Sequence, residues 1–118
     1  MKYRLLGNSG LRVSEAALGT MTFGEDWGWG APKEEAQKVY NAFRDAGGNF
    51  IDTANVYTNG ASETFVGEFA KGHREGMVLA TKFSKAISGN DLGFPQKLFT
   101  RELTQGLRSG GMADRIIA

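Results

Sequence analysis

Three polar side chains in the sequence have the types and the spacing that proton transfer requires. Asp52 and Lys82 each follow a short apolar run, and Tyr57 lies shortly after Asp52. An aspartate pairs with a lysine, and a lysine cation lowers the pKa of a neighbouring phenol from about 10. A phenol tuned in this way can act as a general acid near neutral pH. Reduction of a carbonyl group needs such a donor, because the oxygen must be protonated while the carbon receives hydride.

Each of the three residues also has an ordinary structural explanation when it is taken alone. Asp52 is typical of an Asx turn at the end of a strand, and Tyr57 of an aromatic residue in a loop. Lys82 is typical of a solvated strand terminus. The chemical interpretation therefore depends on the secondary-structure elements that would bring the three side chains together.

Four apolar runs predict the strands of a parallel sheet. They cover residues 16–20, 49–54 and 77–81, and a fourth begins at 115. The runs start near residues 16, 50, 77 and 115, which is 34, 27 and 38 residues apart. This spacing is the length of a βαβ unit with a right-handed crossover. Before them, residues 2–14 predict a hairpin around a turn rich in Gly and Asn.

Helices are predicted between these strands. The first begins at Pro32, a residue tolerated in the first helical position, and ends at Gly47. Its expected apolar face consists of Ala36, Val39, Tyr40, Phe43 and Ala46. A second helix is predicted over residues 62–71, with Phe65, Val66 and Phe69 facing inward, and a third over 98–108.

Two α/β architectures fit this order of elements, a doubly wound dinucleotide fold and a (β/α)8 barrel. The dinucleotide fold needs Gly-x-Gly-x-x-Gly directly between the first strand and the first helix. Residues 28–33 lack the third glycine and follow a long loop, so the barrel is favoured. Catalytic residues of such barrels lie at the carboxyl ends of the strands. We therefore expect Asp52 and Lys82 side by side at one mouth, with Tyr57 above them.

At these residues the sequence resembles the N-terminal half of the aldo-keto reductases, including the potassium-channel beta subunit branch. The matching segments are YRLLGNSGLRVS at 3–14, LGTMTFG at 18–24, AGGNFIDTANVY at 46–57, SE at 62–63 and LATKF at 79–83. The resemblance implies the N-terminal portion of a (β/α)8 barrel, about four of its eight βα units, in a single incomplete domain over 1–118. The hairpin over 1–14 would close the barrel floor. Residues 15–91 match well, and 92–118 match loosely.

The same resemblance implies NADPH-dependent reduction of aldehydes and ketones. Tyr57 would be the proton donor, with Asp52 and Lys82 as the pair that tunes it. The nicotinamide half of the cofactor would touch Thr20, Met21 and Asp52, and the substrate pocket would be walled by Phe23 and Trp27. The family's catalytic histidine would follow the fourth strand, beyond residue 118. His73 is not that residue, and we expect it at the opposite face of the barrel, where residues bear on stability.

Three functional alternatives remain open at this point. The chain is a reductase whose 118-residue piece alone has little activity, a cofactor-binding interaction protein like a potassium-channel beta subunit, or a truncated, non-catalytic remnant. The open edges of a half barrel would also favour self-association. The preferred carbonyl substrate, and NADPH rather than NADH, are not fixed by the residues themselves.

Composition narrows the classes of partner. The 118 residues carry 14 Lys and Arg against 13 Asp and Glu, a net charge of +1, with no basic block. This balance gives no sign of binding to nucleic acid or to a membrane surface. There is no cysteine, so disulfide and thiol chemistry are excluded and a cytoplasmic location is expected. No metal site is predicted.

Overall fold

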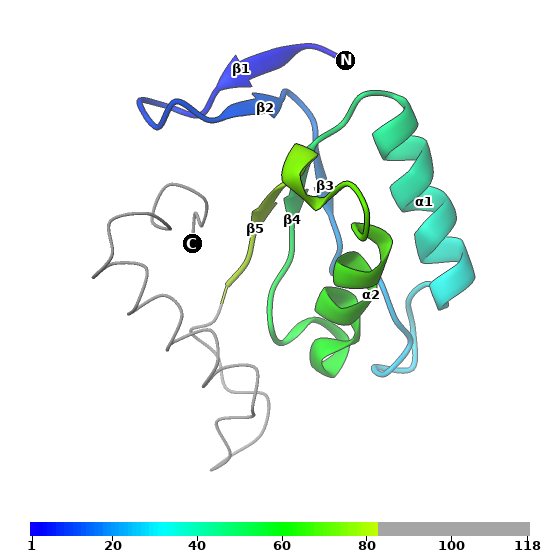
Figure 1. Cartoon of the computed structure of the whole chain (residues 1–118). Helices are drawn as coiled ribbons and strands as arrows, with labels where there is room; N and C mark the ends of the chain where they lie inside the picture. Colours follow the sequence, from blue (N-terminus) through cyan, green and yellow to red (C-terminus); the bar gives the residue numbers. More distant parts are fainter. Residues whose placement is uncertain (83–118) are drawn as a thin grey trace.

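The computed structural model describes residues 1–82, which form a hairpin and a parallel sheet covered by helices (Figure 1). The antiparallel hairpin consists of β1 (Tyr3–Leu5) and β2 (Arg12–Ser14). The parallel strands lie in the order β3 (Ala17–Gly19), β4 (Phe50–Asp52) and β5 (Val78–Ala80). Between them come α1 (Lys33–Asp45) and α2 (Ala61–Phe69), with the short 3-10 turns η1 (Tyr57–Gly60) and η2 (Arg74–Gly76). The predicted third helix and fourth strand lie outside the described residues.

The hairpin is fastened to the amino end of the parallel sheet by Asn49, the residue before β4. Its side-chain oxygen accepts the Ser14 N–H at 2.7 Å, and its amide nitrogen donates to the Arg12 carbonyl at 3.0 Å. Its own carbonyl accepts the Val78 N–H at 2.7 Å. One residue thus joins the hairpin, β4 and β5, and the hairpin lies at the end of the sheet away from Asp52.

The first helix begins one residue later than predicted. Pro32 has the extended ψ of 162° and precedes the helix, while its carbonyl accepts the first helical hydrogen bond, from Ala36 at 2.9 Å. Glu34 and Glu35 lie in the first turn, where negative charge interacts favourably with the helix dipole. The helix is followed by Gly47, whose φ of 88° continues the chain in the left-handed conformation that ends helices.

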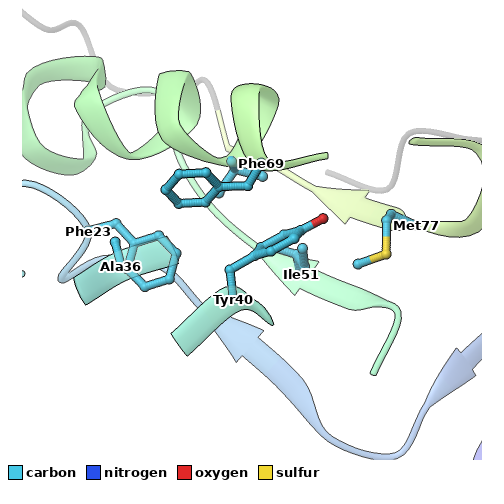
Figure 2. Packing of buried hydrophobic residues seen from close by; sticks show 7 residues of the cluster. Phe23, Ala36, Tyr40, Ile51, Phe69 and Met77 are labelled. Atoms are coloured by element: carbon cyan, nitrogen blue, oxygen red, sulfur yellow. The ribbon is translucent and has the colours of Figure 1, made fainter. Parts of the chain in front are cut away.

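The hydrophobic core lies between the parallel sheet and the two helices (Figure 2). Phe69 of α2 is at its centre, with ring centroids 5.5 Å from Tyr40 and 6.4 Å from Phe23. Of the predicted apolar face of α1, Ala36 and Tyr40 are fully buried and Phe43 packs against the core. Val39 is 47% exposed, so its predicted burial was wrong. The stripe at positions 36, 40 and 43 faces the sheet, and Val39 lies at its flank.

A buried tyrosine links α1 to the segment before β5. The Tyr40 hydroxyl lies 2.8 Å from Nε2 of His73, and burial raises the pKa of Tyr40. We expect Tyr40→Phe to lower the free energy of unfolding by about 1 kcal/mol, because the ring stays packed while the hydrogen bond is lost. Urea unfolding measures this. Tyr3→Phe, which removes an exposed bond to the Gly47 carbonyl, should cost less; an equal or larger loss there would contradict the assignment.

Within residues 1–82, no helix is long and apolar enough to cross a membrane. The same residues contain no group of three His, Cys, Asp or Glu side chains that could hold a metal ion.

Candidate active site

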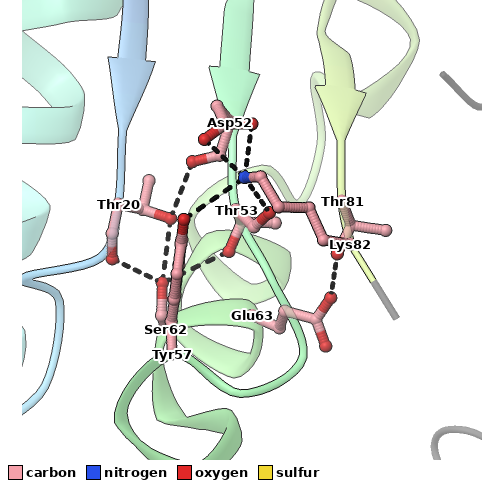
Figure 3. Close-up of polar contacts among 8 residues, drawn as sticks. All are labelled: Thr20, Asp52, Thr53, Tyr57, Ser62, Glu63, Thr81 and Lys82. Atoms are coloured by element: carbon pink, nitrogen blue, oxygen red, sulfur yellow. Dashed lines mark hydrogen bonds and ion pairs between the residues drawn. The ribbon is translucent and has the colours of Figure 1, made fainter. Parts of the chain in front are cut away.

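The register of the parallel strands places Asp52 and Lys82 at the same edge of the sheet. Asp52 is the last residue of β4 and is paired with Gly19 of β3 and Ala80 of β5. Lys82 follows β5 by two residues, so its side chain leaves the sheet on the same side as that of Asp52. Tyr57 begins the η1 turn after β4. The structure thus brings the three side chains together at the carboxyl ends of the strands (Figure 3).

The Lys82 ammonium group is the centre of this cluster. Nζ lies 2.7 Å from both carboxylate oxygens of Asp52, 3.1 Å from the Thr53 carbonyl and 3.2 Å from the Tyr57 hydroxyl oxygen. It also lies 5.1 Å from the centroid of the Tyr57 ring. The ammonium group is the donor in its bond to the phenol oxygen, so the phenol keeps its own hydrogen for donation.

Two opposing effects set the charge of Lys82. Its partial burial favours the neutral amine, but the hydrogen bonds and charges of Asp52 and Tyr57 outweigh burial and raise the pKa of Lys82. The lysine is therefore cationic throughout the neutral range. The side chains of Lys82 and Asp52 are 48% and 41% exposed, and such exposed ion pairs contribute little to stability.

A network of buried hydroxyl groups, not predicted from the sequence, lies beneath the cluster. The Ser62 hydroxyl lies 2.7 Å from the Thr20 carbonyl, 2.9 Å from the Thr20 hydroxyl and 3.3 Å from the Thr53 hydroxyl. Thr20 in turn donates its N–H to the Asp52 carbonyl at 3.0 Å. The network ties the carboxyl ends of β3 and β4 to the first turn of α2. Its signal in the sequence is a threonine just after each of these strands.

A second contact joins α2 to β5. The Thr81 hydroxyl donates to the Glu63 carboxylate, and Thr81 directly precedes Lys82 (Figure 3). The Lys82 carbonyl also accepts the Asn55 N–H at 3.0 Å. Lys82 is thereby bonded through its carbonyl to the segment after β4, and its neighbour Thr81 is bonded to α2.

The residues predicted to line the cofactor and substrate sites differ in their exposure to solvent. Met21 is 46% exposed and directly follows Thr20, at the end of β3; Trp27 is 37% exposed and pairs with Trp29 in the β3–α1 loop, with centroids 5.5 Å apart. Thr20 is fully buried, because its hydroxyl is engaged in the network below Asp52. Phe23 is 2% exposed, because its ring packs against Phe69. The side chains of Thr20 and Phe23 therefore do not reach the surface of the site.

The exposed groups at this edge include one apolar side chain and three polar ones. An apolar thioether, Met21, follows the strand that pairs with Asp52, and the carboxylate, phenol and ammonium groups lie beyond it. An aromatic heterocycle that carries a polar amide fits such a set. Of the residues predicted to touch the cofactor, Met21 and Asp52 are partly exposed, whereas Thr20 is fully buried.

Several known proteins are similar in sequence to this chain. An aryl-alcohol dehydrogenase [NADP(+)] from Phanerodontia chrysosporium is 49% identical over 87 residues, covering 69% of this chain and 23% of the relative. A probable voltage-gated potassium channel subunit beta from Oryza sativa subsp. japonica is 38% identical over 113 residues, covering 92% and 32%. The chain thus spans between about a quarter and a third of these relatives' lengths.

Solved structures and a family model establish the fold and the family. An aldo-keto reductase from Bacillus halodurans, in its holo form, superposes with a TM-score of 0.69 at 34% identity, covering 92% of this chain and 36% of that one. The predicted fold is confirmed: the hairpin and the parallel βα units form the N-terminal portion of a (β/α)8 barrel. The model described as "Aldo/keto reductase family" matches residues 16–112, and the chain therefore belongs to the aldo/keto reductase family.

Proposed function

We propose that this protein is an NADPH-dependent oxidoreductase that reduces aldehydes and ketones to alcohols, with Tyr57 as proton donor. The observation that carries the proposal is the contact of the Lys82 ammonium group with both Asp52 and Tyr57 at the carboxyl end of the strands. A small carbonyl compound would be the substrate. Names of similar proteins support the class: besides the NADP(+) aryl-alcohol dehydrogenase, a norsolorinic acid reductase from Emericella nidulans is 46% identical over 81 residues.

The cluster divides the proton transfer among its members. The bound cofactor would supply hydride to the carbonyl carbon. The Tyr57 phenol donates its hydrogen to the carbonyl oxygen, and negative charge then develops on the phenol oxygen. The Lys82 ammonium group, 3.2 Å away, stabilises this charge, since a preorganised cation is most effective where charge forms. Asp52 holds the ammonium group in place, and the hydroxyl network holds Asp52.

We propose that the 118-residue chain alone turns over little carbonyl substrate. It spans 23% of the length of the aryl-alcohol dehydrogenase and 36% of that of the Bacillus halodurans reductase. Purified chain would be assayed for NADPH oxidation with 4-nitrobenzaldehyde, and we expect a rate close to the uncatalysed background. Robust turnover would contradict the proposed inactivity of the isolated chain and leave the chemistry of the site intact.

A chimera tests the chemistry itself. Residues 1–82 would replace the corresponding segment of the Phanerodontia chrysosporium aryl-alcohol dehydrogenase, which is 49% identical over the matched region. We expect the chimera to oxidise NADPH in the presence of 4-nitrobenzaldehyde. A folded chimera that binds NADPH but has no carbonyl-dependent oxidation would contradict the proposed function.

A second candidate function is a cofactor-binding interaction protein. It is favoured by the likeness to the probable potassium channel beta subunit, which extends over 92% of this chain. Tight NADPH binding without carbonyl reduction, in a tetramer on size-exclusion chromatography, would support this alternative over the reductase.

A further inference from the structure

The residue that follows Tyr57 has a strained backbone. Thr58 has φ 46° and ψ 45°, in the left-handed region, and it is fully buried. A β-branched residue rarely adopts this conformation. Such strain persists only where the surroundings hold it, and it is concentrated at functional sites. The next residue, Asn59, is also left-handed, but asparagine tolerates that conformation.

Two buried hydrogen bonds of one hydroxyl group hold Thr58. Its Oγ1 donates to the Phe23 carbonyl at 2.6 Å and accepts the Ser62 N–H at 3.1 Å. These partners belong to the β3–α1 loop and to the first turn of α2. The hydroxyl of Thr58 therefore joins the η1 turn both to the distant β3–α1 loop and to the helix that follows the turn. We call this pair of hydrogen bonds the clamp.

Gly24 makes this clamp sterically possible. A Cβ atom at position 24 would lie 2.8 Å from Oγ1 and 3.0 Å from Cβ of Thr58. The φ of Gly24 is 105°, which side-chain-bearing residues rarely adopt. The loop backbone thus approaches the η1 turn as closely as only glycine allows, which is needed for the Phe23 carbonyl to reach the Thr58 hydroxyl.

The clamp lies directly beside the proposed proton donor. Tyr57 precedes Thr58, and its phenol oxygen reaches Lys82 across 3.2 Å. We propose that Thr58 is a positioning residue, whose buried hydroxyl and strained backbone hold the Tyr57 phenol beside the Lys82 ammonium group. The effect of Thr58 on catalysis rests on the proposed function, whereas its effect on the placement of Tyr57 can be measured without turnover.

Three substitutions separate positioning from general stability. Thr58→Ser keeps the hydroxyl. Thr58→Gly removes the hydroxyl but relieves the backbone strain, so that its two effects on stability oppose each other. Thr64→Ala is the matched control, because it removes an exposed threonine hydroxyl from the adjacent helix α2, one that donates to the Gly60 carbonyl.

The test is NMR on the full 118-residue chain, with thermal melting measured on the same samples. The nuclear Overhauser effect between the Tyr57 ring protons and the Lys82 side chain should be present in the unsubstituted chain, Thr58→Ser and Thr64→Ala. It should be lost in Thr58→Gly while the melting temperature shifts little. Activity does not enter this measurement, so a failed reductase assay and a failed positioning test are distinguishable.

Each other outcome overturns the proposal. An unchanged nuclear Overhauser effect between Tyr57 and Lys82 in Thr58→Gly would show that the Thr58 hydroxyl does not position the phenol. Loss of the effect in Thr58→Ser would show that the hydroxyl is not what holds it. If Thr58→Gly unfolds while Thr58→Ser stays folded, Thr58 has a structural role only.

Discussion

Replacing Tyr57 with phenylalanine is expected to lower kcat for carbonyl reduction in the chimera by about 10²–10⁴-fold, the contribution typical of a positioned general acid. The ring and its contact with the Lys82 ammonium group remain, but the carbonyl oxygen loses its proton donor. NADPH oxidation with 4-nitrobenzaldehyde measures the effect, and NADPH affinity should change little.

Tyr3→Phe is the control for this substitution. It also removes a tyrosine hydroxyl, one that donates to the Gly47 carbonyl at the hairpin end of the sheet, and it should leave turnover unchanged. If Tyr57→Phe were within a few-fold of the unsubstituted chimera, another group would have to supply the proton.

Lys82→Met is expected to lower kcat by about 10²–10³-fold, the usual cost of removing one group that stabilises transition-state charge. Methionine preserves much of the length of the side chain but removes the cation beside the phenol oxygen and leaves Asp52 without its ion pair. The free energy of unfolding should fall by no more than about 1 kcal/mol, because the pair is half-exposed. Turnover and urea unfolding of the same variant separate the two roles.

Lys33→Met offers a matched comparison. Lys33 of α1 forms a similarly exposed ion pair with Glu68 of α2, with side chains 46% and 40% exposed. Its loss should affect stability to a similar extent and turnover not at all. Equal losses of turnover in the two lysine variants would mean that Lys82 acts only as a structural ion pair.

The strand ends were predictable from the sequence because two regular patterns determine them. Apolar runs predict the parallel strands, and parallel strands present their carboxyl ends at one edge. Asp52 and Lys82 follow such runs, and the structure places them within 2.7 Å of each other. Tyr57 could be placed near them because only a few residues separate it from Asp52.

The loop after β3 could not be predicted in the same way, since loops have no periodicity that says which side chain turns inward. Thr20 is buried because of Ser62, and Phe23 because of Phe69, partners more than forty residues away in the sequence. Met21, between them, stays exposed. The resemblance assigned Thr20, Met21 and Phe23 to the site, but it could not say which of these side chains would be buried.

The left-handed backbone of Thr58 was equally hidden. Asn59 and Gly60 favour a turn in the sequence, but threonine opposes the conformation it adopts. Its cause lies in the Phe23 carbonyl and the close approach of Gly24, both set by tertiary packing. Local propensity thus fails at the residue next to the proposed proton donor, where strain is expected to serve function.

Isotope transfer measures whether the cluster of Asp52, Tyr57 and Lys82 supports hydride reduction of a carbonyl group. The chimera would be incubated with 4-nitrobenzaldehyde and NADPH carrying deuterium at both C4 positions of the nicotinamide, and the alcohol analysed by mass spectrometry. We expect one deuterium on the carbinol carbon, formed far more slowly by Tyr57→Phe. Alcohol without deuterium would contradict hydride transfer from NADPH to the carbonyl carbon. Equal formation of the deuterated alcohol by Tyr57→Phe would contradict proton donation by Tyr57.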